Sequence, residues 1–196
     1  MSDLRDHAWP LSELLRRYRA VRGIKQAHLA ELIHVSQSTV SKWESGVATP
    51  NEDQYFQIIE LLGAKPTIVE DTWLARLIET SRERIHAICD ITHRLLVASP
   101  ARYQEWRREP SEMFHRPLLY DAPDDIVDAE RRLVQRDHGL PFDKPLLVKT
   151  SGQASGRYRV MAGFVLWERL QLTDGTWVRL VTSIDAARIP RRAVMV

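Results

Sequence analysis

Residues 25–46 read KQAHLAELIHVSQSTVSKWESG, and this stretch decides the fold of the first part of the chain. Its apolar residues recur at helical spacing on both sides of a polar break, which predicts two short helices joined by a tight turn. The first helix is expected over about residues 26–33 and the second over about residues 37–45. On the second helix, Val40 and Trp43 form one apolar face and leave small polar side chains on the other. A helix of this kind suits insertion into the major groove of DNA.

Helical patterns also lie before and after this pair. Before it, Ser12 is expected to cap a helix that Gly23 ends. The apolar stripe of that helix consists of Leu14, Leu15, Tyr18 and Val21. After the pair, Asn51 caps a further helix that Gly63 ends. We therefore expect residues 11–62 to form an all-α unit.

This unit resembles the Cro/repressor-type helix-turn-helix domain, also called the XRE family. The positions that carry the resemblance are Gln26, Leu29, Ala30, Val35, Ser36, residues 38–41, Trp43, Glu44, Gly46 and Pro50. The resemblance implies a lambda-repressor-like fold of four or five helices, whose third helix docks in the major groove of double-stranded DNA. We place this helix-turn-helix DNA-binding domain at residues 9–66.

The resemblance also implies which side chains contact DNA. Glutamine can form a bidentate pair with adenine, serine is a permissive reader of base edges, and lysine can reach guanine or a phosphate. The expected base-reading residues on the third helix are Gln37, Ser38, Ser41 and Lys42. The expected phosphate contacts, at helix starts and on nearby cationic side chains, are Gln26, Ser36, Thr39, Arg16, Arg17 and Lys25.

Arg19 and Glu44 occupy positions that pair in this family, so we expect a structural ion pair that ties the first helix to the third. Two other residues depart from the family pattern. His34 stands where the family commonly has glycine in the turn, and histidine tolerates a positive φ with some strain. Lys25 replaces the usual serine or threonine cap before Gln26, which weakens that helix start but places a cation near the phosphates.

The composition is that of an ordinary globular protein. The chain has 196 residues, of which 44% are hydrophobic and 28% charged, and a formal net charge of +2. No apolar run approaches the roughly 20 residues that span a bilayer, and the N-terminus does not resemble a signal peptide. The single cysteine, Cys89, cannot form an internal disulfide and lies in an apolar stretch, which predicts a buried structural thiol. These features favour a cytoplasmic protein.

After residue 66 the sequence pattern changes. Residues 67–82 predict a connector helix, and residues 83–185 run in the order β-β-α-α-α-β-β-β, with a hairpin signal at Asp174 and Gly175. This order, and residues 91–100 (ITHRLLVASP) in particular, resemble a PAS-like sensor domain. Such a domain is an α+β fold whose five-stranded antiparallel sheet carries helices on one face. Residues 186–196 are expected to form a basic tail.

No catalytic, metal or cofactor site is predicted in this second half. His86, His93, His115 and His138 lack the spacing of metal or haem ligands. A self-cleaving Ser/Lys peptidase is disfavoured because no lysine follows Lys149. Aromatic side chains that either line a pocket or fill the core are Trp106, Phe114, Tyr120, Phe164, Trp167 and Trp177.

Together these patterns predict a sequence-specific transcriptional regulator, a repressor that binds a palindromic operator as a homodimer. The C-terminal domain is expected to dimerise or to sense a small-molecule or protein effector. The alternative is a toxin–antitoxin or other protein-interaction component whose DNA binding serves autoregulation. The protein is not expected to be an enzyme.

Overall fold

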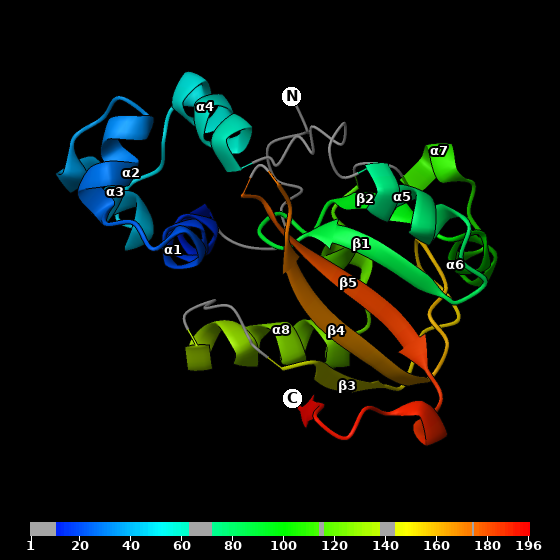
Figure 1. Cartoon of the computed structure of the whole chain (residues 1–196). Helices are drawn as coiled ribbons and strands as arrows, with labels where there is room; N and C mark the ends of the chain where they lie inside the picture. Colours follow the sequence, from blue (N-terminus) through cyan, green and yellow to red (C-terminus); the bar gives the residue numbers. More distant parts are fainter. Residues whose placement is uncertain (1–10, 63–71, 114–115, 138–143, 174) are drawn as a thin grey trace.

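The computed structural model describes residues 11–62, 72–113, 116–137, 144–173 and 175–196. Figure 1 shows two parts, a group of helices on one side and a twisted sheet with its own helices on the other. The boundary that the sequence predicts at residues 66–67 lies outside the described residues.

Four helices make up the N-terminal part: α1 (Leu11–Arg22), α2 (Gln26–Leu32), α3 (Gln37–Glu44) and α4 (Glu52–Leu62). The helices follow the predicted pattern, although α1 begins one residue before the expected cap, Ser12. Asn51 caps α4, since its Oδ1 accepts from the backbone N–H of Gln54 at 2.9 Å while the Gln54 side chain accepts from the N–H of Asn51. Gly46 follows α3 with a φ of +73°, a conformation that glycine adopts without steric cost.

The C-terminal part begins with α5 (Thr72–Glu79), the predicted connector, which lies against the first two strands. The strands are β1 (Ile85–Cys89), β2 (Leu95–Ala98), β3 (Leu146–Thr150), β4 (Gly163–Gln171), β5 (Trp177–Ile184) and β6 (Val194–Met195). Between β2 and β3 come α6 (Pro100–Trp106), α7 (Pro110–Met113), the 3₁₀ turn η2 (Leu118–Asp121) and α8 (Asp124–Asp137). A second 3₁₀ turn, η3 (Ala186–Arg188), precedes β6.

The strands are arranged in the order β2-β1-β5-β4-β3-β6. The first five are antiparallel to their neighbours, and β4 and β5 pair from Phe164 opposite Ile184 to Gln171 opposite Trp177. Gly175 lies in the turn between them with a φ of +82°, at the predicted hairpin. The predicted β-β-α-α-α-β-β-β order and the antiparallel sheet of five strands are therefore confirmed.

The sheet also has a sixth strand, which the sequence did not predict. In the expected basic tail, β6 pairs with β3 in parallel, and the N–H of Val196 donates to the carbonyl of Leu147 at 3.0 Å. Residues 186–196, expected only as a basic tail, therefore include a short strand. Its physical reason is that β3 would otherwise present an unpaired edge, which the chain end covers.

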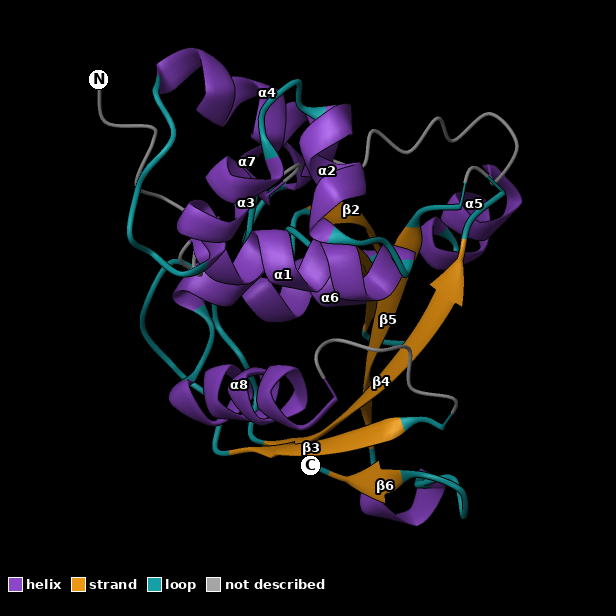
Figure 2. Cartoon of the chain, turned by 90° about the vertical axis from the view of Figure 1, so that its left-hand side faces the viewer, coloured by secondary structure: helices purple, strands orange, loops and turns teal. Residues whose placement is uncertain are grey.

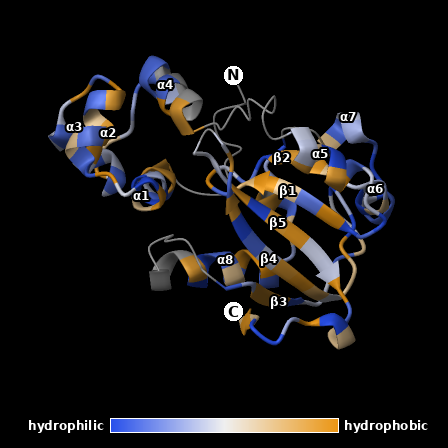
Figure 3. Ribbon diagram, in the orientation of Figure 1, coloured by the Kyte–Doolittle hydropathy of each residue, from blue (hydrophilic) through white to orange (hydrophobic). Residues whose placement is uncertain are grey.

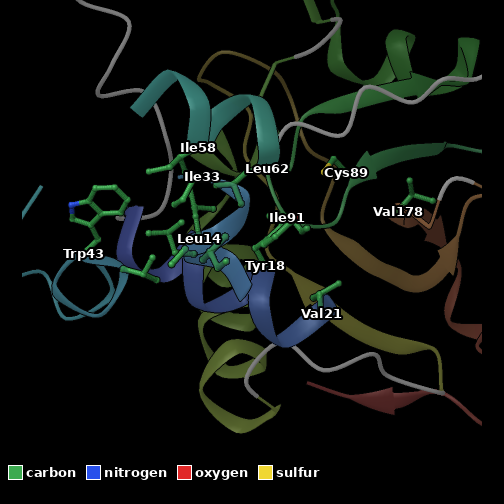
Figure 4. Packing of buried hydrophobic residues seen from close by; sticks show 14 of the residues in the cluster. Leu14, Tyr18, Val21, Ile33, Trp43, Ile58, Leu62, Cys89, Ile91 and Val178 are labelled. Atoms are coloured by element: carbon green, nitrogen blue, oxygen red, sulfur yellow. The ribbon is translucent and has the colours of Figure 1, made fainter. Parts of the chain in front are cut away.

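Two apolar clusters organise the molecule. One lies between the sheet and its helices and includes Trp106, Ala129, Leu133, Val165 and Val181. The other, shown in Figure 4, joins the core of the helical part to the near end of the sheet. Its members include Leu14, Tyr18 and Val21 of α1 together with Cys89, Ile91 and Val178 of the C-terminal part. The two parts of the chain therefore share one continuous apolar core.

Candidate nucleic-acid interface

The turn between α2 and α3 is held by backbone hydrogen bonds and one side-chain cap. The N–H of Val35 donates to the carbonyl of Ala30 at 2.9 Å, which reverses the chain. His34 is exposed and has a φ of +53°, the conformation that its place in the turn requires. Ser36 caps α3, because its Oγ accepts from the N–H of Thr39 at 3.1 Å. The start of the third helix is thus fixed locally.

The outer face of α3 presents polar side chains to solvent. Val40 and Trp43 are buried, so packing turns the opposite face outward. The residues expected to read bases are Gln37, Ser38 and Lys42, which are exposed, and Ser41, which is partly buried. In Figure 1, α3 lies at the edge of the molecule farthest from the sheet. The structure therefore leaves this face accessible to a large ligand.

Several of the expected phosphate contacts lie beside this face. The Nε2 of Gln37 donates to the Oε1 of Gln26 at 3.2 Å, which brings the starts of α2 and α3 together. Lys25 precedes α2, is exposed and makes no side-chain cap, as its sequence predicts. The hydroxyls of Ser36 and Thr39 lie 2.8 Å apart at the first turn of α3. Polar donors therefore gather where the positive ends of two helices meet.

Arg19 and Glu44 form an ion pair between α1 and α3. The Nε of Arg19 lies 2.6 Å from Oε1 of Glu44, and its second nitrogen lies 2.8 Å from Oε2. Glu44 is buried, and its carboxylate also accepts from Gln26 at 2.9 Å. The hydrogen bond to Glu44 raises the pKa of the Arg19 guanidinium. Arg16, whose side chain is exposed, donates to the main-chain carbonyl of Glu44, so two α1 arginines bind the end of α3.

Arg17 does not lie at this interface, contrary to the sequence prediction. Its side chain is only 3% exposed and points into the C-terminal part. There its guanidinium pairs with Asp90 at 3.3 Å and with Glu130 on α8. Arg17 is therefore corrected from a phosphate contact to a buried residue of the contact between the two parts.

Arg17 belongs to a cluster of buried charges whose other members are Asp90, His93, Glu130, Arg169 and Arg179. Asp90 lies 2.5 Å from Arg169 and 2.6 Å from Arg179. Glu130 pairs with Arg179 and lies 3.2 Å from Nε2 of His93. In Figure 3 the sheet turns hydrophilic where β4 approaches the helical part. Each carboxylate is thus shared by several cations in a setting that excludes water.

The cations hold both carboxylates in their charged form. Burial acts to raise the pKa of Asp90, but Arg179, Arg17 and Arg169 outweigh it and lower that pKa to about 2. The pKa of Glu130 is lowered well below its usual range for the same reason, although burial opposes the shift. Burial lowers the pKa of His93 against the attraction of Glu130. At neutral pH the cluster therefore combines three arginines, two carboxylates and a neutral histidine.

A cavity of about 60 Å³ lies in the C-terminal part beside this cluster. Its aromatic wall includes Trp106, Tyr158 and Trp167, and its polar wall includes His86 and Arg102. Burial, followed by the charge of Arg102, lowers the pKa of His86 well below its usual value. His93, Glu130 and Arg179 line the same space, so the cavity and the charged cluster share a wall. The volume suffices for a few water-sized groups.

The sequence analysis did not predict the cavity or the buried charged cluster. His86 and His93 meet at one cavity although their spacing shows no ligand pattern, and His115 and His138 lie outside the described residues. Of the six aromatic residues, Trp106 and Trp167 line the cavity, whereas Phe164 and Trp177 are partly buried elsewhere. Phe114 and the side chain of Tyr120 lie outside the described part. One sequence feature could have indicated the charged cluster: Arg169 and Arg179 are charged residues within largely apolar strands.

Among the described residues, no group of histidine, cysteine, aspartate or glutamate side chains has the arrangement of a metal site. None of the described helices is long and apolar enough to cross a membrane. Cys89 is a buried free thiol, as predicted.

Comparison with known proteins assigns part of the chain. Residues 15–69 match the family model HTH_3, described as helix-turn-helix. No curated protein matches the chain. Among solved structures, the chain is similar to the PAS domain of an HTR-like protein from Haloarcula marismortui, with 20% identity over 59% of this chain and 90% of that one, and a TM-score of 0.43. It is also similar to an RNA-binding Light-Oxygen-Voltage receptor, with 12% identity over 90% of this chain and 59% of that one, and a TM-score of 0.37.

Both TM-scores lie below 0.5, so the fold of the second part is assigned from its own topology. That topology is an antiparallel sheet in the order β2-β1-β5-β4-β3, with α6 to α8 inserted between β2 and β3. The N-terminal part therefore contains a helix-turn-helix domain, with a family match over residues 15–69, and a C-terminal domain with a PAS-like fold follows it.

Proposed function

We propose that the protein is a sequence-specific transcriptional regulator, a cytoplasmic repressor that binds a palindromic operator as a homodimer. The observation that carries this proposal is the outer face of α3, where Gln37, Ser38 and Lys42 are exposed on a capped helix. A helix with such a face fits the major groove, which is wide enough to admit it. The Arg19–Glu44 pair supports the proposal because it holds this helix rigidly against α1.

The side chains divide into two proposed roles. Gln37 and Ser38 read base edges, with Gln37 pairing to adenine, and Lys42 and Ser41 extend this contact along the groove. The phosphate contacts are Arg16, Lys25, Gln26, Ser36 and Thr39. Base contacts carry sequence information, whereas phosphate contacts fix register and supply salt-dependent affinity.

The C-terminal domain is proposed to dimerise the protein or to sense an effector. Two-fold symmetry then places two α3 helices on half-sites about one turn of DNA, ~10 bp, apart or a multiple of it. The cavity beside His86 and Trp106 has room for a few water-sized groups, so it supports sensing of a very small molecule only. An antitoxin segment that folds only on its partner is less well supported, since the described C-terminal residues already form a six-stranded sheet.

The test is selection of bound sequences from a random pool of duplex DNA, carried out with the purified full chain at two salt concentrations. We expect enrichment of an inverted repeat and weaker binding at the higher salt. The control is a Gln37→Ala and Lys42→Ala double variant, whose changes lie on the exposed face and leave the core untouched. Recovery of no motif by the parent chain, or of the same motif by the double variant, would overturn the proposal.

A further inference from the structure

The first helix has two faces with different partners. On one face, Arg19 and Arg16 bind Glu44 of α3. On the other, Arg17 reaches into the C-terminal domain and pairs with Asp90 and Glu130. Figures 1 and 2, which differ by a quarter turn, both show α1 between α3 and α8. A helix bound in this way joins the reading helix to the sensor domain.

The contact with the C-terminal domain excludes water. Arg17 is 3% exposed and both of its partners are fully buried. Around it, Leu14, Tyr18 and Val21 belong to the apolar cluster that contains Ile91 and Val178. Charged partners fix the direction of the contact, because a slip would leave a buried charge without a partner. The surrounding apolar shell alone is less directional.

The path from sensor to reading helix is short. Glu130 on α8 holds Arg17, α1 carries the constraint over half a turn to Arg19, and Arg19 holds Glu44 at the end of α3. Since α1 is a continuous helix between these residues, its two faces cannot move independently. None of these contacts uses the exposed face of α3.

We propose that Arg17, with Asp90 and Glu130, is a positioning residue that fixes the orientation of α3 relative to the C-terminal domain. The reading helix then has one direction in the molecule rather than a range of directions on a tether. If the protein binds DNA as a homodimer, which rests on the proposed function, this orientation selects the half-site spacing. Contact of Arg17 with DNA forms no part of this role.

The variant Arg17→Met tests the proposal while sparing each domain. Methionine keeps much of the apolar stem of arginine. After the change, Asp90 still has Arg169 and Arg179, and Glu130 still has Arg179 and His93. No buried carboxylate is left unpaired inside the C-terminal domain, so that domain should fold. The control is Arg131→Met, which changes an exposed arginine next to Glu130 on α8 whose ion pair, with Asp128, lies within that helix.

The decisive readout is the distance between spin labels on the two domains. Labels are attached at Glu31→Cys on α2 and Lys149→Cys on β3, both exposed positions, while Cys89 is buried. The labelled chain is diluted with unlabelled protein so that distances within one chain are measured. We expect one narrow distance in the parent and in Arg131→Met, and its loss to a broad distribution in Arg17→Met, with circular dichroism unchanged. A narrow, unshifted distance in Arg17→Met would overturn the proposal.

If circular dichroism shows that Arg17→Met is unfolded, Arg17→Lys replaces it. Lysine keeps the charge but cannot bind two carboxylates through a planar fork, so the distance distribution should again broaden. An unchanged distribution in Arg17→Lys would also contradict the proposal.

A DNA readout separates this proposal from the proposed function. In Arg17→Met, affinity for a single half-site should match the parent, whereas the preference for one half-site spacing should fall at least about tenfold. Loss of the narrow distance with an unchanged spacing preference would contradict the role in spacing. Failure of the parent to bind any DNA would overturn the proposed function, and the distance measurement would still decide the positioning role.

Discussion

Two arginines that lie two residues apart on α1 form different kinds of ion pair. Arg19 forms a local pair within its own domain, whereas Arg17 forms a long-range pair with the other domain. Arg19 binds Glu44 within the helix-turn-helix domain and keeps 23% of its side chain exposed. Arg17 binds Asp90 and Glu130 of the other domain and is nearly inaccessible. The local pair shapes the helix-turn-helix domain, whereas the long-range cluster joins that domain to the C-terminal domain. The comparison shows that the same residue type on one helix can serve two levels of organisation.

Glu130→Ala is expected to have the largest effect, because it strands cations on both sides of the domain contact. Glu130 is fully buried and pairs with Arg17, Arg179 and His93. We expect a loss of about 3–5 kcal/mol in the free energy of unfolding, measured by urea denaturation. The matched control is Asp128→Ala on the same helix, whose exposed pair with Arg131 should contribute less than about 1 kcal/mol. Equal losses in the two variants would contradict the importance of the cluster.

Glu44→Ala is expected to cost less, about 2–3 kcal/mol, since Arg19 regains contact with water when its partner is removed. Unlike the loss at Glu130, this one should be local. Hydrogen exchange should therefore accelerate in α1 to α4 while the sheet remains protected. Glu31→Ala on the exposed face of α2 serves as the control. Faster hydrogen exchange in the sheet as well would show that the Arg19–Glu44 pair also affects the C-terminal domain.

Acid is expected to weaken the long-range cluster through its buried histidine, His93. His93 has a lowered pKa in the folded state, so below pH 6.5 the unfolded chain binds the proton more readily and stability falls as pH drops. The slope is at most about 1.4 kcal/mol per pH unit for each such histidine, and His86 adds its own share. Asp90, whose pKa is lowered from 3.8 to about 2, contributes a further loss as the pH falls from about 3.8 towards 2.

The measurement is urea denaturation of the parent and of His93→Gln between pH 7.5 and 5. Glutamine is polar like histidine but cannot take up a proton, so the pH dependence of stability should flatten in part. His28→Gln, at an exposed position on α2, should leave it unchanged. If the free energy of unfolding of His93→Gln depends on pH in the same way as that of the parent, His93 is not the source of the acid sensitivity.

His34→Gly is expected to have the smallest effect and the opposite sign. His34 adopts a positive φ in the turn, which costs a residue with a Cβ roughly 1–2 kcal/mol. Glycine removes that strain but loses more conformational entropy on folding. We therefore expect the free energy of unfolding, measured by urea denaturation, to rise by about 0.5 kcal/mol. His28→Gly inside α2 should instead destabilise by roughly 0.5 kcal/mol. Destabilisation by His34→Gly would contradict the account of the turn.

The local level of this structure could be predicted from the sequence. Helical periodicity predicts α1 to α4, the pattern around Ser36 predicts the turn, and alternation with Asp174 and Gly175 predicts the β4–β5 hairpin. These signals lie within a few residues of the structure they specify. The exposed residues of α3 could be predicted for the same reason, because burial of Val40 and Trp43 determines which side chains remain outside.

The long-range level could not be predicted. Arg17 and Glu130 are separated by 113 positions, and nothing near either residue identifies the other as its partner. An arginine beside Arg16 on a DNA-binding helix has the pattern of a phosphate contact, so its burial became evident only from the packing of the two domains. The parallel pairing of β6 with β3 was missed for the same reason, since a short terminal segment contains no local pattern of its own.

We propose that α3 reads bases while the neighbouring polar and cationic residues contact only phosphate. The most direct test is the affinity of the parent, Gln37→Ala and Arg16→Ala for every single-base change of a selected half-site. We predict that Gln37→Ala loses discrimination at one or two positions, worth about 1–3 kcal/mol at each. Arg16→Ala should weaken binding to all sequences equally and retain the discrimination. If Gln37→Ala still discriminates between bases at every position, or if both variants lose discrimination equally, this division of roles would be contradicted.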